Sequence, residues 1–121
     1  MDGKRYYWLK LYEDFFESKR IKKLRKLGEP CLIVYLKMQL KALKTGGVIE
    51  WAHVEDDIVD ELALDLNEPA EYVKRALDFM IDQGLCEVYD DGGTYYLPYV
   101  AYNTGSETAG TQRWRDWKKR H

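Results

Sequence analysis

Four acidic side chains stand close together in a segment predicted to start a helix: Asp56, Asp57, Asp60 and Glu61. Carboxylates spaced four residues apart share one helix face and could hold a magnesium ion. Phosphoryl or hydrolytic chemistry would also need a lysine, histidine or nucleophile to complete the site, and neither His53 nor His121 has a recognisable partner. We therefore expect a solvated acidic helix start, with no metal site, no cofactor and no enzymatic activity.

A concentration of basic side chains could contact nucleic-acid phosphates. The helix predicted between Ser18 and Gly28 carries six lysines and arginines. Its apolar stripe consists of Ile21, Leu24 and Leu27. Because basic side chains bind phosphates by displacing counterions, we favour phosphate contact over a merely solvated face. The candidates on this helix are Lys19, Arg20, Lys22, Lys23 and Lys26.

The net charge of −2 conceals a segregation of charge along the chain. Residues 1–47 hold 12 lysines and arginines against 5 acids, whereas residues 48–102 hold 2 against 14. Residues 103–121 are basic again, with 5 against 2. The acidic middle segment could pair with a basic surface of a second copy or of a host protein, so we expect self-association.

The hydrophobic pattern predicts one mainly helical α+β domain over residues 1–102, followed by a tail over residues 103–121. A chain of this length can bury one core, and no apolar run approaches the ~20 residues of a membrane span. The expected elements are, in chain order, a strand over 5–11, helices over 18–28 and 30–46, a strand over 48–51, helices over 55–66 and 68–84, and strands over 85–89 and 94–100 joined by a turn over 90–93.

The same spacing selects the residues expected in the core. The first strand alternates as a half-buried strand does, with Tyr7, Leu9 and Leu11 on one side, and Cys31 and Cys86 are expected inside as reduced thiols. The hairpin tyrosines Tyr89, Tyr95, Tyr96 and Tyr99 are assigned to packing rather than to base stacking. The later helices are expected to bury Leu32, Ile33, Leu36, Leu40, Leu43, Ile58, Leu62, Val73, Ala76, Leu77, Met80 and Ile81, with Val59 and Leu66 as further candidates.

The order helix, strand, helix, helix, hairpin, with only residues 66–68 between the last two helices, is typical of a winged helix-turn-helix. In this class the last helix enters the major groove. The candidates for groove contact are Asn67, which we expect to cap this helix, and the outward-facing Tyr72, Lys74 and Arg75. Acidic neighbours would oppose the approach of DNA, so sequence-specific readout stays an open alternative. They are Glu68, Glu71, Asp78, Asp90 and Asp91.

The tail combines aromatic and basic residues. Its first residues, TGSE at 104–107, fit a capping box, which predicts that a helix follows. Arg113 and Arg115 are candidates for phosphate contact, and the tail is either an appendage or the start of a linker to a further region. Trp114 and Trp117 lie three residues apart on one face, so they either fold back on the domain or form a partner interface.

Several stretches resemble the N-terminal domain of phage replisome organizers. They are RYYWLKL at 5–11 with EDFF at 13–16, KRIKKLR at 19–25, YLKMQLK at 35–41, and NTGSET at 103–108. The resemblance covers nearly the whole chain in the same order. It implies a winged-helix domain, related to DnaD-like primosomal proteins, that helps a phage or prophage begin replication in the cytoplasm of its bacterial host. Longer members of the family continue into a region expected to recruit host replication proteins.

We interpret the chain as a non-catalytic DNA-binding and assembly module for replication initiation. Its expected partners are origin DNA, duplex rather than single-stranded, a second copy of itself and host helicase-loading proteins, with no membrane. One alternative is a winged-helix protein-interaction scaffold that does not read DNA sequence. Another is a phage transcriptional repressor, which would be expected to carry a more basic last helix.

Overall fold

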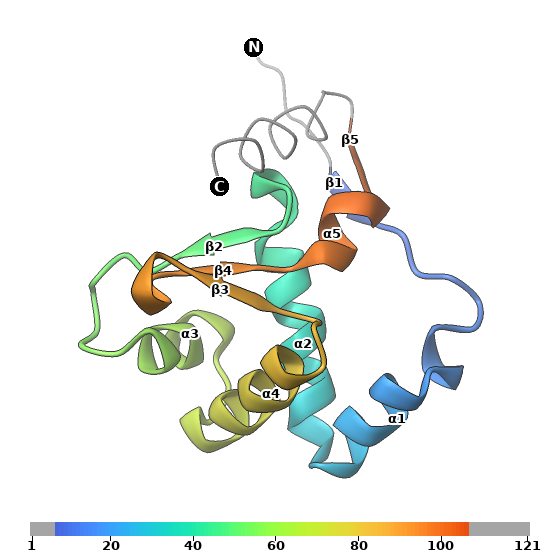
Figure 1. Ribbon diagram of the computed structural model, residues 1–121, viewed down its shortest axis with the longest axis horizontal. Helices are drawn as coiled ribbons and strands as arrows, with labels where there is room; N and C mark the ends of the chain where they lie inside the picture. The colour runs from blue at the N-terminus through green and yellow to red at the C-terminus, as the bar shows by residue number, and fades with distance from the viewer. Residues whose placement is uncertain (1–6, 107–121) are drawn as a thin grey trace.

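The computed structural model describes residues 7–106, which form a mixed α+β fold that is mainly helical, as predicted (Figure 1). The helices are α1 (Lys19–Lys26), α2 (Glu29–Lys41), α3 (Ile58–Leu66), α4 (Ala70–Asp82) and α5 (Pro98–Asn103). The strands are β1 (Tyr7–Leu9), β2 (Val48–Glu50), β3 (Glu87–Tyr89), β4 (Thr94–Tyr96) and β5 (Thr104–Ser106). None of the helices in this part of the chain is long and apolar enough to cross a membrane.

Helix α2 is the centre of the core. Figure 1 shows it running through the middle, with α1 on one side, α3 and α4 on the other, and a sheet across its C-terminal end. Its inward face includes Val34, Tyr35 and Met38, all almost fully buried. Cys31 and Cys86 are buried free thiols, as expected, and burial raises the pKa of both, that of Cys86 to about 12. The core therefore forms between α2 and the helices on both of its sides.

The prediction of which residues of α2 face the core is partly wrong. Leu32 and Leu43 are buried and Leu36 is half-buried, but Ile33 and Leu40 are 42% and 56% exposed. The physical reason is that α2 is apolar on almost every side, so residue spacing alone selects no single face. Packing against α1 and α4 decides the orientation instead and leaves an apolar strip on the surface.

A three-stranded antiparallel sheet has the order β2-β4-β3. The predicted hairpin is confirmed: β3 and β4 pair, and Asp90 and Asp91 both have φ near 53° in the turn between them. The strand expected over 94–100 is wrong beyond Leu97, whose N–H donates the last ladder bond to the carbonyl of Gly47. Pro98 then starts α5, because proline has no N–H to extend the ladder and its fixed φ suits a first helical turn.

After α5 the chain returns to its beginning. Strand β5 pairs antiparallel with β1, so that Tyr7 lies opposite Ser106 and Leu9 opposite Thr104. The predicted capping box is therefore wrong, because Gly105 and Ser106 continue β5 instead of starting a helix, and the hydroxyl of Thr104 donates to the carbonyl oxygen of Trp8 at 2.9 Å. Of the residues that the alternation placed together, Tyr7 and Leu9 are half-buried in β1, whereas Leu11 lies beyond the strand and is exposed. The helix predicted for the tail lies outside the described residues.

The connection between α3 and α4 differs in detail from the prediction. Asn67 ends α3 in the left-handed conformation, with φ 56°, and Pro69 takes the N-cap position of α4 that we expected for Asn67. Asparagine tolerates this conformation better than most residues do, which explains its place at the turn. Ile81 is half-exposed rather than buried. The remaining core positions expected on α4 are confirmed: Val73, Ala76, Leu77 and Met80.

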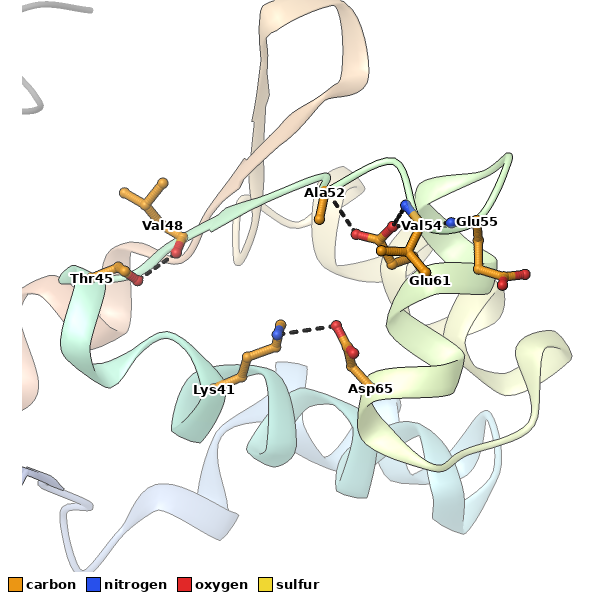
Figure 2. A network of polar contacts seen from close by, with 8 residues as sticks. All are labelled: Lys41, Thr45, Val48, Ala52, Val54, Glu55, Glu61 and Asp65. Carbon is orange, nitrogen blue, oxygen red and sulfur yellow. Dashed lines mark hydrogen bonds and ion pairs between the residues drawn. The ribbon is translucent and has the colours of Figure 1, made fainter.

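A carboxylate ties the loop after β2 to α3 (Figure 2). Glu61 is buried and accepts hydrogen bonds from the backbone N–H groups of Ala52, Val54 and Glu55 at 2.7, 2.7 and 3.2 Å. Burial by itself would raise the pKa of Glu61, but these three bonds and nearby His53 lower it below its ordinary value. The Glu61 side chain that could have been a metal ligand is thus occupied in holding the loop.

Candidate nucleic-acid interface

Helix α1 carries the basic residues predicted to contact phosphates. It starts after Ser18, which is extended, and ends before Gly28, whose φ of 141° breaks the helix. Ile21 and Leu24 are buried against the core, and the six basic side chains are all exposed. Helical geometry places Lys19, Lys22, Lys23 and Lys26 on the side opposite the buried stripe, and Arg20 and Arg25 on its two flanks.

Some of these cations have acidic partners and others do not. Lys22 lies 3.5 Å from a carboxylate oxygen of Glu17, and Arg25 lies 3.0 Å from one of Glu29. Both pairs are exposed, so they cost little to separate. Within residues 7–106, the other basic residues of α1 have no carboxylate within ion-pair distance: Lys19, Arg20, Lys23 and Lys26. Their charges are available to a phosphate backbone.

The predicted groove-contact residues on α4 are engaged within the domain. The ammonium of Lys74 lies 2.9 Å from both carboxylate oxygens of Asp78. Nη1 of Arg75 donates to the carbonyl oxygen of Leu27 at 2.8 Å, and the guanidinium lies 5.0 Å from the centre of the Tyr72 ring. Tyr72 is half-buried against the core, so its expected outward position is wrong. The structure thus joins α4 to the end of α1 through Tyr72 and Arg75.

Acidic side chains dominate the exposed surface of α4 and of the hairpin. Glu71, Asp78 and Asp82 are exposed on α4, and Asp90 and Asp91 are exposed at the hairpin turn. The hydroxyl of Thr94 donates to Asp90 at 2.9 Å, which leaves the aspartate charge in place. The basic surface of the described residues that is free of acidic partners is therefore on α1 rather than on α4 or the hairpin.

The hairpin tyrosines pack rather than face outward, as predicted. Tyr95 and Tyr96 are buried. Burial is the main cause that raises the pKa of Tyr95 to about 12, and the neighbouring Cys86 is the second cause. Tyr89 is half-buried and donates to a carboxylate oxygen of Glu87 at 2.5 Å. Tyr99 is half-buried and donates to the carbonyl oxygen of Lys10 at 2.8 Å. These rings stabilise the sheet and the start of α5.

Other predicted site residues are placed as follows. Asn67 is exposed at the end of α3 and lies on a different element from the cations of α1. Arg113, Trp114, Arg115 and Trp117 lie outside the described residues. Over residues 7–106 there is no cluster of three or more histidines, cysteines or acids that could hold a metal ion. The sequence patterns did not predict the contact of Arg75 with the end of α1. Gly28, which breaks the helix, was the only signal in the sequence that another element approaches the end of α1.

These features define a small α+β domain whose unpaired positive charge gathers on one exposed helix. Comparison with protein families gives a match to the N-terminal phage replisome organiser over residues 8–121. The match spans most of the sequence, so the chain belongs to this family, as its resemblance indicated, and its role is related to phage replication. Comparison with curated proteins and with solved structures gave no match.

Proposed function

We propose that the chain is a non-catalytic module that binds duplex DNA at a replication origin and assembles there with further copies. The observation that carries this proposal is the outward face of α1, where three lysines have no acidic partner in the described residues. Cations in this arrangement gain affinity for DNA by releasing condensed counterions. The proposal places the chain in the cytoplasm of the bacterial host, with host helicase-loading proteins as further partners.

We propose that the domain that carries out this DNA binding is a winged helix-turn-helix. Support comes from the order α2, β2, α3, α4 and hairpin, from the three residues that separate α3 from α4, and from the antiparallel pairing of β2 with the hairpin strand β4. In such a fold α4 would approach the major groove and the β3–β4 hairpin would be the wing. The acids on both elements argue for limited groove contact. Phosphate contacts by α1 then supply most of the affinity and position the domain.

Charge reversal on α1 tests this proposal. Replacing Lys19, Lys22, Lys23 and Lys26 by Glu should weaken duplex binding strongly and flatten its salt dependence, since each lost phosphate contact removes about 0.9 from the slope of log K against log salt. The measurement is fluorescence anisotropy of labelled duplex DNA across a salt series. An unchanged affinity and slope in this variant, shown to be folded by circular dichroism, would mean that α1 is only a solvated face.

A matched pair of single substitutions controls for the loss of charge alone. Lys23→Gln removes one unpaired cation from α1, whereas Lys41→Gln removes one exposed cation from α2, where it lies 3.1 Å from Asp65. Both variants change the net charge equally. We expect only Lys23→Gln to lower duplex affinity and the salt slope.

A protein-interaction scaffold is the second candidate, because the structure leaves apolar side chains on the surface of α2. Ile33 and Leu40 lie on one side of this helix, seven residues apart, with Lys37 and Lys41 beside them. A second copy could cover this apolar strip, while Lys37 and Lys41 keep their ion pairs with Glu68 and Asp65. A transcriptional repressor is less well supported, since Lys74 and Arg75 already have partners within the domain.

A further inference from the structure

A cavity of about 390 Å³ lies beside α1, between the residues that precede this helix, α2 and the start of α5. Four aromatic residues line it: Tyr12, Phe15, Tyr35 and Tyr99. Phe15 and Tyr99 meet edge to face, with ring centres 6.1 Å apart. The hydrogen bond from Tyr99 to the carbonyl of Lys10 holds the second ring in place. Contacts within the domain thus hold Phe15 and Tyr99 in the cavity wall.

Tyr35 contributes a phenolic hydroxyl to the residues that line this cavity. Its side chain comes from α2, is only 1% exposed and forms part of the cavity lining. Burial, with Tyr99 and Cys86 as smaller causes, raises the pKa of Tyr35, so the hydroxyl stays protonated and can donate. A hydroxyl in the wall of a cavity can donate to a ligand that enters it.

Charged side chains complete the lining, and they are of both signs. Arg20 belongs to α1 and brings one flank of the basic helix to the cavity, while Asp14 and Glu17 come from the segment before the helix. Carboxylates accept hydrogen bonds from the amino groups of bases, and arginine binds phosphates or stacks on rings. Aromatic walls, a hydroxyl donor and carboxylate acceptors together suit a flat, polar aromatic ring.

We propose that this cavity binds one unpaired nucleobase of a DNA strand whose phosphates lie along α1. The inference rests on the proposed function for the phosphate contacts and adds a site for single-stranded DNA. The cavity lies near the lower end of the roughly 300–1,000 Å³ range of small-molecule sites, which is enough for a base with its sugar. Unpaired bases stack on aromatic side chains, whereas a base held in a duplex cannot reach such a site.

The two carboxylates predict which bases are preferred. Cytosine and adenine each carry an exocyclic amino group that can donate to Asp14 or Glu17, and thymine carries none. Oligonucleotides of dC and dA should therefore bind more tightly than dT of the same length. Asp14→Asn, combined with Glu17→Gln, should reduce this preference, because each amide has lost one of its two acceptor oxygens.

Tyr35→Phe is the decisive variant because it keeps the ring and removes only the hydroxyl. It should weaken the binding of short single strands about three- to tenfold and leave duplex affinity unchanged. Tyr95→Phe is the matched control, since Tyr95 is also buried but does not line the cavity. The probe is a single-stranded oligonucleotide with one 2-aminopurine, whose fluorescence should be quenched when the base stacks in the cavity.

The outcomes separate this inference from the function on which it rests. Duplex binding that depends on α1, without quenching of 2-aminopurine and without an effect of Tyr35→Phe, overturns the nucleobase site and leaves the proposed function standing. Loss of self-assembly in Tyr35→Phe, with single-strand binding intact, would assign the cavity to a protein side chain and also overturn it. Absence of binding to any DNA would overturn both.

Discussion

Arg75 connects two helices that are far apart in the sequence. Its guanidinium donates to the carbonyl oxygen of Leu27, which lies at the C-terminal end of α1 where helix carbonyls lack partners within the helix. A positive charge at this end also interacts favourably with the helix dipole. Arg75 therefore stabilises the position of α1, and a change at this residue would affect the proposed DNA binding through α1 as well as through any direct contact.

Gly28, which follows α1, lies close to Tyr72 and Arg75 of α4. A Cβ added at this residue would lie 2.9 Å from a ring carbon of Tyr72, and its φ of 141° is a conformation that side chains disfavour. We expect Gly28→Ala to lower the free energy of unfolding by roughly 1–3 kcal/mol. Urea denaturation measures the change. Gly84→Ala is the control, because Gly84 has φ 76° and open space around its Cα.

Gly84→Ala should cost only about 1 kcal/mol, the penalty of a side chain in a left-handed conformation. Equal losses in the two variants would show that Tyr72 moves aside easily and that the contact between α1 and α4 is loose. A larger loss for Gly28→Ala means that the crossing is tightly packed. In that case the position of the basic helix depends on α4.

At the scale of elements, the loop over residues 51–57 depends on one ionised carboxylate. Glu61 accepts three backbone N–H groups from this loop, and its pKa is lowered from an ordinary value of 4.5. A lowered pKa means that the ionised form stabilises the folded state above pH 4.5. This contribution is lost as the pH falls through the pKa of the folded state.

Glu61→Gln should therefore lower stability at neutral pH and make the loss of stability in acid less steep. The amide keeps one acceptor oxygen but turns a donor toward the loop N–H groups. The urea midpoint, measured at neutral pH and at several values below 4.5, tests this expectation. Asp60→Asn is the control, since Asp60 is exposed and has no hydrogen bond to the loop. Parallel pH profiles for wild type and Glu61→Gln would contradict the role assigned to Glu61.

Sequence patterns predicted some elements well and others poorly, for identifiable reasons. In α1 and α4 charged residues mark the solvent side, so Ile21, Leu24, Val73 and Leu77 were placed correctly in the core. In α2 apolar residues occur on nearly all sides, and only tertiary packing decides that Leu40 faces outward. Helix α5 was missed because its apolar residues continue the pattern of β4, although Pro98 marked the break.

Of the candidate site, only the group of basic residues on α1 could be predicted from the sequence. The cations of α1 could be found because they are adjacent in sequence. Asp78, the partner of Lys74, is four residues away and could be predicted from helical spacing. Leu27, the partner of Arg75, is 48 residues away, so sequence spacing does not reveal it. The aromatic cavity combines residues from the start, middle and end of the domain, and only the fold brings them together.

The whole molecule presents surfaces of different character, and this favours assembly. We expect a dimer or a larger assembly at micromolar concentration, because the apolar strip of α2 and the segregated charges offer complementary surfaces. Analytical ultracentrifugation would show a species heavier than the 14.3 kDa chain. A monomer alone at about 100 μM, roughly the upper limit for specific assembly, would exclude this expectation.

Leu40→Gln tests whether α2 forms the interface. Leu40 is 56% exposed, so the substitution should weaken assembly without lowering the free energy of unfolding appreciably. Leu64→Gln is a close control, because Leu64 is 63% exposed but lies on α3. Equal effects of the two variants on assembly would indicate a general dependence on surface hydrophobicity and no specific contact through α2.

The pairing of β1 with β5 determines how the domain responds to tension. Tyr7 and Ser106 lie opposite each other at one end of the ladder, where the described chain begins and finishes. A force that pulls these two residues apart breaks the paired residues of the ladder one after another and does not shear all of them at once. We therefore expect this short ladder to open under tension before the helices packed around α2 separate.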